Sequence, residues 1–179
     1  MSLSLGSSIR PFQLKNVDGS AVSSDDLRKN AKAAAVVFWC NHCPYVQAWE
    51  ERMVRLGNEY RDRGVAFVLI NANDPKKYPE DDFSGMVKRS GEKGYPFAYL
   101  HDETQATARA YGATRTPEVF LFDSKGILGY HGRIDDNYED PGAVRSHDLK
   151  DALEAVLAGK RPENPETPLV GCTIKWKPS

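Results

Sequence analysis

The chain has 179 residues and a formal net charge of −1, with 24 basic side chains nearly balanced by 25 acidic ones. A balance of this kind gives no electrostatic argument for nucleic acid or an anionic membrane surface as a partner. No apolar run approaches the roughly 20 residues that cross a bilayer, and three cysteines are too few for a disulfide-stapled secreted domain.

The N-terminal segment predicts a β-hairpin followed by a short helical turn. Residues 9–27 read as a strand, an Asp18–Gly19 turn, a second strand and a turn capped by Ser23 or Ser24. The apolar run of residues 33–38 then has the length and composition of a strand covered on both faces. We expect the hairpin to lie over one edge of the sheet that contains this strand.

An amphipathic helix follows that strand, because apolar side chains recur at steps of three and four from Val46 to Tyr60. Residues 65–70 form a second apolar run. A strand, a helix and a strand with a crossover of this length predict a parallel pair with a right-handed connection. Since loops gather at the carboxyl ends of parallel strands, the polar loop of residues 71–77 is expected to flank the start of the helix.

The second half of the chain contains the remaining predicted elements. They are a helix that opens at Pro79, a short helix that ends at Tyr111, a hairpin over residues 114–130 and a helix over residues 146–158. We therefore predict a single domain over residues 1–160. Residues 161–179 are rich in proline and predict an irregular C-terminal tail that carries Cys172.

The Cys40–Cys43 pair has the Cys-x-x-Cys spacing and lies where the first buried strand gives way to the helix. A helix N-terminus stabilises a thiolate, since it presents unpaired N–H groups and a partial positive charge. We expect Cys40 to gain most and to act as the nucleophile, with Cys43 resolving the mixed disulfide. Protonated His42 would favour the anion further. A structural zinc ion needs four ligands and the only other cysteine is Cys172, so the pattern predicts redox chemistry with no metal and no cofactor.

The order of these elements, with Thr116–Pro117 before the closing hairpin and helix, resembles the thioredoxin superfamily over residues 9–159. The segment AYGATRTPEVFLFDSKG is similar to the branch that holds peroxiredoxins and TlpA-type reductases. CNHCPYV, HGRIDDNY and GCTIKW together resemble a bacterial peroxiredoxin-like family with a CNHC motif. The resemblance implies an α/β thioredoxin-like fold: a central mixed β-sheet flanked by helices, with an N-terminal β-hairpin extension.

The resemblance also implies roles for residues around the cysteines. Pro117 should be a cis proline beside the disulfide, and Thr116 should offer backbone groups to a bound extended peptide. Trp39 and Arg115 join Thr116 as candidates for substrate contact, although Trp39 also fits a core position. Thioredoxins hold a buried aspartate on the strand before their motif. That strand has no carboxylate here, so Glu118 becomes the candidate proton acceptor.

These motifs favour a thiol–disulfide oxidoreductase that exchanges with a disulfide- or thiol-bearing protein or a small thiol. The alternative is a thiol peroxidase. Peroxiredoxins hold peroxide with a Pro-x-x-x-Thr-x-x-Cys motif and a distant arginine. If Cys43 is laid on the peroxidatic cysteine, the threonine position holds Cys40 and the arginine position holds Pro117. For peroxidase chemistry, Arg115 or Arg133 would have to supply the positive charge.

Several questions stay open at the level of sequence. Cys172 fits a third redox thiol, a bridge between two subunits or a small buried hydrophobic residue. A metal-delivery module that uses His131 is a further alternative. His42 resembles the histidine of Cys-Pro-His-Cys oxidases and predicts a reduction potential above that of thioredoxin. The chain is expected to be a monomer or a homodimer. Because its first residues lack the pattern of a signal peptide, a cytoplasmic protein is expected, and a periplasmic one stays open if a leader was trimmed.

Overall fold

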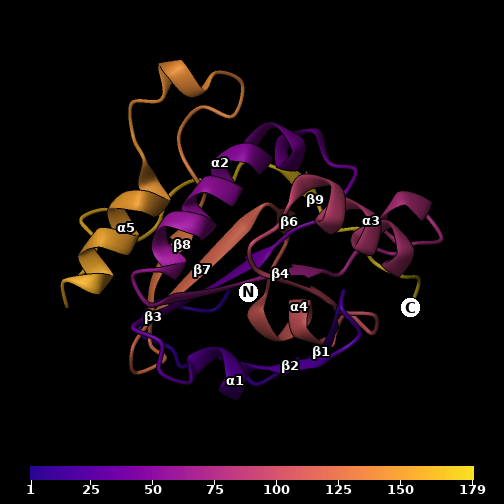
Figure 1. Cartoon of the computed structure of the whole chain (residues 1–179), viewed down its shortest axis with the longest axis horizontal. Coiled ribbons are helices and arrows are strands. Elements are labelled where there is room, and N and C mark those ends of the chain that lie inside the picture. Colours follow the sequence, from indigo (N-terminus) through magenta and orange to yellow (C-terminus); the bar gives the residue numbers. More distant parts are fainter.

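Seven strands form one mixed sheet between two layers of helices in the computed structural model, which describes residues 1–179 (Figure 1). The chain has nine strands in all: β1 (Gln13–Asn16), β2 (Ala21–Ser23), β3 (Ala33–Phe38), β4 (Val65–Asn71), β5 (Ala98–His101), β6 (Arg115–Thr116), β7 (Glu118–Asp123), β8 (Leu128–Gly132) and β9 (Cys172–Thr173). Across the sheet they follow the order β2-β1-β5-β4-β3-β7-β8, while β6 and β9 pair separately.

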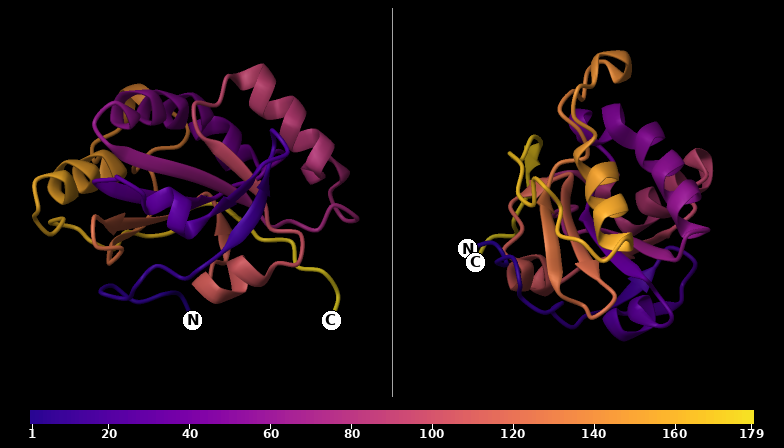
Figure 2. Two further views of the ribbon diagram at one scale, coloured as in Figure 1. Left: turned by 60° about the horizontal axis from the view of Figure 1, so that its bottom comes forward. Right: turned by 90° about the vertical axis from the view of Figure 1, so that its left-hand side faces the viewer.

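The helices divide between the two faces of the sheet (Figures 1 and 2). They are α1 (Ser24–Arg28), α2 (Pro44–Arg61), α3 (Phe83–Lys93), α4 (Ala106–Tyr111) and α5 (Asp148–Leu157), with 3-10 turns η1 (Pro79–Asp81) and η2 (Pro141–Ala143). Side chains of α2, α3 and α5 belong to one apolar cluster, and those of α1 and α4 to the other. None of the helices combines the length and apolarity that crossing a bilayer requires.

Strand β3 lies between the two clusters, and this position explains why its sequence is apolar throughout. Ala35 and Val37 belong to the cluster under α2 and α5, whereas Val36 and Phe38 belong to the cluster on the opposite face. The alternation follows from the two-residue period of a strand. β3 pairs in parallel with β4 and antiparallel with β7, so the predicted buried strand and parallel pair are confirmed. Its carboxyl end delivers the Cys-x-x-Cys segment.

The N-terminal hairpin forms as predicted but occupies a different place. β1 pairs antiparallel with β2 and also with β5, so the hairpin extends the sheet at its edge and does not lie over it. Ser23 begins α1 with a capping box, in which its Oγ accepts from Asp26 N at 3.1 Å and the Asp26 carboxylate accepts from Ser23 N at 3.0 Å.

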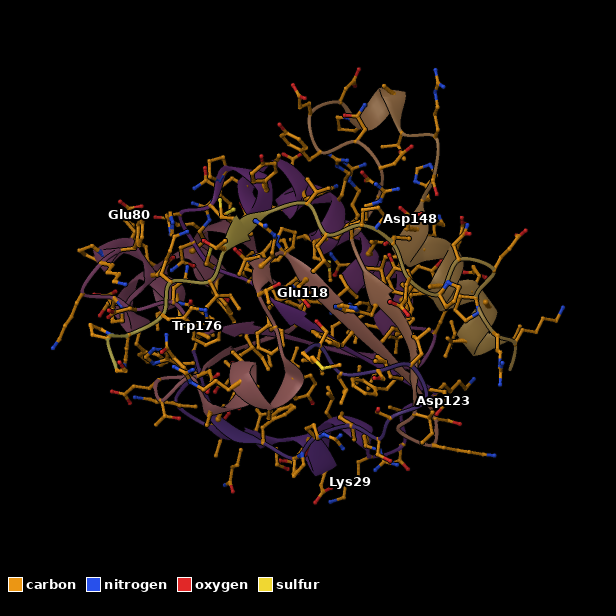
Figure 3. The ribbon with its side chains drawn as sticks, turned by 180° about the vertical axis from the view of Figure 1, so that it is seen from behind. Lys29, Glu80, Glu118, Asp123, Asp148 and Trp176 are labelled. Atoms are coloured by element: carbon orange, nitrogen blue, oxygen red, sulfur yellow. The ribbon has the colours of Figure 1, made fainter.

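The C-terminal segment is more ordered than its proline-rich sequence suggested. β9 pairs antiparallel with β6, with Thr116 opposite Cys172. Ile174 is 3% exposed and its N–H donates to Thr114 O at 2.9 Å, while Lys175 N donates to Asn73 Oδ1 at 2.9 Å. These contacts hold the C-terminal segment against the domain, on the side of the molecule seen in Figure 3.

Candidate active site

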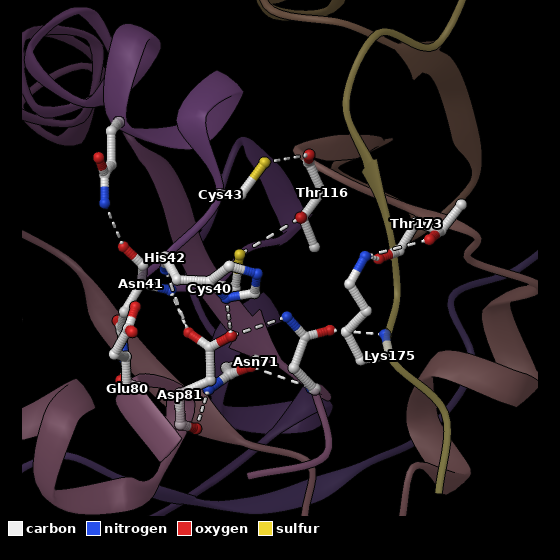
Figure 4. Close-up of polar contacts among 12 residues, drawn as sticks. Cys40, Asn41, His42, Cys43, Asn71, Glu80, Asp81, Thr116, Thr173 and Lys175 are labelled. Atoms are coloured by element: carbon white, nitrogen blue, oxygen red, sulfur yellow. Dashed lines mark hydrogen bonds and ion pairs between the residues drawn. The ribbon is translucent and has the colours of Figure 1, made fainter. Parts of the chain in front are cut away.

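The two cysteines of the Cys-x-x-Cys segment lie at the N-terminus of α2, and both are fully buried (Figure 4). Cys43 is the N-cap residue and Pro44 is the first residue of the helix. Thr116 contacts both sulfurs. Its Oγ1 lies 3.4 Å from Cys40 Sγ, and its carbonyl accepts from the Cys43 thiol at 3.5 Å. The strand that precedes Pro117 therefore closes one side of the site.

The two sulfurs have opposite acid strengths. A hydrogen bond from Cys40 lowers the pKa of Cys43 from 9.0 to about 5, aided by contacts from Cys172 and from Val46 N–H. The hydrogen bond to Cys43, burial and the charge of Asp81 raise the pKa of Cys40. The sequence assigned the thiolate to Cys40, and the structure favours Cys43. The physical reason is that Cys43 is the helix N-cap, whereas Cys40 lies before the helix and beside a carboxylate.

Asp81 is a site residue that the sequence did not identify. Its buried carboxylate accepts from Asn41 N at 2.6 Å, from Asn73 Nδ2 at 2.9 Å and from the ring of His42, with which it forms an ion pair. The His42 ring also stacks on Tyr78 with ring centroids 4.1 Å apart. Asp81 therefore fixes His42 and supplies the buried carboxylate that the strand before the motif lacks.

The Cys-x-x-Cys segment is held rigidly by Asn41. Its Nδ2 donates to Glu80 O at 2.8 Å, its Oδ1 accepts from Tyr99 OH at 2.8 Å, and its carbonyl accepts from Gln47 Nε2 at 2.9 Å. The end of β4 and the loop after it also reach the site, because Asn71 Nδ2 donates to Asp81 O at 2.8 Å and Asn73 Nδ2 donates to the Asp81 carboxylate at 2.9 Å. The expectation that this loop flanks the site is confirmed.

Glu118 is buried, in contrast to acids such as Asp123 at the periphery of the molecule (Figure 3). Its carboxylate accepts from Thr114 N at 2.9 Å and Arg115 N at 3.0 Å, and it lies 2.6 Å from His131 Nε2. None of its contacts reaches a cysteine sulfur. Glu118 thus orders the segment that leads to the cis Thr116–Pro117 peptide bond, and its role as proton acceptor stays a prediction.

The structure gives other roles to three further candidates. Trp39 is fully buried and donates from Nε1 to Tyr95 OH at 3.0 Å, which fits the core position, and its contact with substrate stays a prediction. Arg115 Nη1 donates to Gly171 O at 3.1 Å. Arg133 Nε donates to Asp148 Oδ2 at 2.7 Å. Arg133 is therefore engaged away from the sulfurs, whereas Arg115 binds the backbone next to Cys172.

Cys172 is the third sulfur of the site. It lies opposite Thr116, whose carbonyl accepts from the Cys43 thiol, and burial, followed by the proximity of Cys43, raises the pKa of Cys172 to about 11. Unlike Cys40 and Cys43, it is partly exposed. β9 places it there by pairing with Thr116.

One group of side chains has the composition of a metal site. Cys40, His42 and Asp81 each offer one ligand atom, and these atoms lie within 4.8 Å of one another. The oxygens of Asp81 already accept hydrogen bonds from the chain, as described above. His131, the candidate for a metal-delivery module, contacts Glu118 instead.

Comparison with known proteins places this geometry in context. The model of the AhpC/TSA family matches residues 5–131. The chain is 26% identical over 118 residues to the thiol-disulfide oxidoreductase ResA of Halalkalibacterium halodurans, a match that covers 65% of this chain and 61% of ResA. It therefore spans about three fifths of the length of that relative.

Two crystal structures illustrate the similarity in fold. An uncharacterized conserved protein from Geobacillus kaustophilus is 43% identical, with a TM-score of 0.92 over 98% of this chain and 94% of that one. A putative thiol:disulfide interchange protein DsbE from Chlorobium tepidum is 23% identical, with a TM-score of 0.62 over 73% and 85% of the two chains. The fold is therefore thioredoxin-like, as the sequence resemblance implied.

Proposed function

The chain belongs to the AhpC/TSA family, and from this premise we propose that it is a thiol–disulfide oxidoreductase. In this proposal Cys40 and Cys43 alternate between a dithiol and a disulfide as they exchange with a thiol- or disulfide-bearing protein or a small thiol. The match to ResA, a thiol-disulfide oxidoreductase, supports this class of reaction.

The observation that carries the proposal is the placement of two cysteines at the N-terminus of α2, where both sulfurs contact Thr116 beside the cis peptide bond to Pro117. The expected acid strengths of the two thiols agree with it. The low pKa of Cys43 keeps this sulfur ionised near neutral pH, and the raised pKa of Cys40 keeps its proton in place. A thiolate is both the attacking species and the better leaving group in disulfide exchange. A pair of cysteines with one thiolate and one thiol is thus suited to reversible formation of the Cys40–Cys43 bond.

The reaction balances without a cofactor. When the Cys40–Cys43 bond forms, the two sulfurs give up two electrons to a partner disulfide, whose S–S bond breaks to give two thiols. The proton of Cys40 and one proton from solvent complete those thiols. In the reverse direction a partner dithiol is oxidised, and Cys43 leaves as the thiolate.

The surroundings of the motif favour the oxidising direction. The His42 ring contacts the Asp81 carboxylate, and a positive charge on His42 would offset the negative charge that Asp81 directs at Cys40. A stabilised dithiol state makes the corresponding disulfide a stronger oxidant. We therefore propose a reduction potential above that of thioredoxin.

The peroxidase alternative has less support. A peroxide needs a cationic donor beside the thiolate to stabilise the departing oxygen. Arg115 donates to Gly171 O and Arg133 donates to Asp148, so neither guanidinium group is available at Cys43.

The proposal is tested by measuring insulin-disulfide reduction and peroxide consumption for wild type, Cys40→Ser and Cys43→Ser. Wild type should accelerate insulin reduction by dithiothreitol. Cys43→Ser should lose that activity and Cys40→Ser should lose most of it, because the Cys40–Cys43 disulfide cannot form. Peroxide consumption should stay at the uncatalysed rate in all three proteins. Rapid peroxide consumption that depends on Cys43, without insulin reduction, would replace the proposal with the peroxidase.

A further inference from the structure

The backbone edge beside the two cysteines is occupied by the chain's own C-terminal strand. The resemblance implied that Thr116 offers its backbone groups to an extended peptide, yet β6 is paired with β9. Figure 4 shows Thr116 between the two sulfurs and the C-terminal segment that carries Thr173 and Lys175. The residue opposite Thr116 is Cys172. The segment thus holds the place of a substrate peptide and presents a cysteine to the site.

Gly171 shows that this approach is close. A Cβ atom at Gly171 would lie 2.2 Å from Thr116 O and 3.2 Å from Pro117 N, distances that only a glycine avoids. Arg115 Nη1 donates to the Gly171 carbonyl at 3.1 Å and fixes the same backbone. The segment around Cys172 therefore packs against the residues before Pro117 as a bound peptide would when it adds a strand to a sheet edge.

The three sulfurs differ in their access to solvent. Cys40 and Cys43 have no exposed surface, while Cys172 is partly exposed, packs against the apolar cluster that contains both cysteines, and lies opposite Thr116, whose carbonyl accepts from the Cys43 thiol. Disulfide exchange requires direct attack of one sulfur on another. Of the three, Cys172 is therefore the sulfur most open to a partner thiol in solution.

We propose that Cys172 is the thiol through which partners exchange with this site, so that the disulfide passes from Cys40–Cys43 to Cys43–Cys172 before a partner attacks it. The inference rests on the proposed dithiol exchange. It adds Cys172 to the two catalytic cysteines, so that three sulfurs take part in the exchange in turn.

Each step of the relay balances. The Cys172 thiolate attacks Cys43 Sγ, the Cys40–Cys43 bond breaks, and Cys40 takes up the proton that Cys172 gave up. A partner thiolate then attacks Cys172 Sγ, and Cys43 leaves as the thiolate that its low pKa favours. A second partner thiol attacks the partner's own sulfur in the mixed disulfide and releases Cys172 as a thiol. The partner is oxidised by two electrons and the Cys40–Cys43 pair is reduced.

A trapping experiment tests the second disulfide directly. The Cys40→Ser variant keeps only Cys43 and Cys172 as cysteines. Trypsin places Cys43 on the peptide of residues 33–52 and Cys172 on that of residues 161–175. After oxidation with oxidised glutathione, mass spectrometry should find these two peptides joined in most molecules. Cys43→Ser, treated identically, should not join Cys40 to Cys172.

A second variant separates the docking of β9 from the chemistry of its thiol. Gly171→Ala keeps all three cysteines but forces the strand away from Thr116. Introduced into the Cys40→Ser background, it should reduce the yield of joined peptides severalfold. Equal yields with and without this substitution would show that the pairing of β6 with β9 does not deliver the thiol.

The rate of exchange tests whether partners use this route. Reduction of the oxidised protein by glutathione should be about tenfold slower in Cys172→Ser than in wild type, because the exposed sulfur is lost. The equilibrium constant with glutathione should stay within about twofold of wild type, since Ser can still donate a hydrogen bond to Cys43. Thr173→Ala changes the exposed neighbour on the same strand and should match wild type.

The outcomes distinguish the two proposals. A Cys172→Ser protein that exchanges at the wild-type rate, or a Cys40→Ser protein that forms no Cys43–Cys172 disulfide, would overturn the relay alone. A wild-type protein that exchanges with neither glutathione nor insulin would overturn the proposed function, and the relay with it.

Discussion

Titration of Cys43 decides which sulfur carries the charge of the site. Its pKa is lowered from 9.0 to about 5, first by the hydrogen bond from Cys40. At pH 7 such a thiol is ionised in roughly 99 of 100 molecules, against about one in 100 for a thiol with a pKa of 9. As the pH is raised, the ultraviolet absorbance of the thiolate in reduced wild-type protein should therefore increase with a midpoint near pH 5.

The variants divide this signal between the cysteines. Cys43→Ser should abolish the acid transition, because the pKa values of Cys40 and Cys172 are both raised. Cys40→Ser should keep the transition but move it to higher pH, since the serine hydroxyl is a weaker donor and the contacts from Cys172 remain. An acid transition that survives in Cys43→Ser and disappears in Cys40→Ser would refute the reasoning and return the thiolate to Cys40.

The same shift links stability to pH. The folded pKa of Cys43 lies below that of the unfolded chain, so its ionisation stabilises the reduced protein fully above about pH 9 and not at all below about pH 5. Through that window Cys40 and Cys172 stay protonated in the folded protein. The free energy of unfolding of the reduced protein should rise with pH between these limits, and that of the oxidised protein should lack this contribution. Urea unfolding of both forms measures the difference.

Three further substitutions test the support of the site. Asp81→Asn should lower the free energy of unfolding by about 2 kcal/mol in urea titrations, because buried donors lose their acceptor, and should lower the pKa of Cys40. Glu118→Gln should cost about 1–3 kcal/mol by the same measurement, yet leave the pH profile of exchange unchanged in shape, since Glu118 contacts backbone and His131 and no sulfur. His42→Gly should lower the reduction potential by about 30 mV in equilibration with glutathione, because Asp81 would lose its partner.

A control variant for these substitutions comes from the same part of the chain, and each prediction has an outcome that would contradict it. Glu80→Gln alters an exposed side chain next to Asp81 and should leave stability unchanged within about 0.5 kcal/mol. An Asp81→Asn protein as stable as this control would mean that the carboxylate is not needed. A displaced pH profile in Glu118→Gln would restore its role as proton acceptor, and an unchanged potential in His42→Gly would remove the histidine from the control of direction.

Local sequence determined the centre of the fold and the position of its motif. The unbroken apolar run predicted β3, and apolar residues at helical spacing predicted α2. Both predictions need only the local sequence, because the spacing of apolar residues shows which sides of an element are buried. The two cysteines between these elements were therefore assigned correctly to a helix N-terminus. Local patterns also located the loop after β4 and the short N-terminal hairpin.

Tertiary structure alone decided how the site works. Asp81 follows a proline in a polar run and has the pattern of an ordinary acid at a helix start, and only packing of η1 against the Cys-x-x-Cys segment turns it into the partner of His42. Cys172 is a single cysteine in a proline-rich tail until β9 pairs with β6. The ionised sulfur depends on contacts between segments distant along the chain. Such contacts leave no periodic signal in the sequence. Each one pairs individual polar groups, whereas periodic patterns arise when a whole face of a helix or strand is buried.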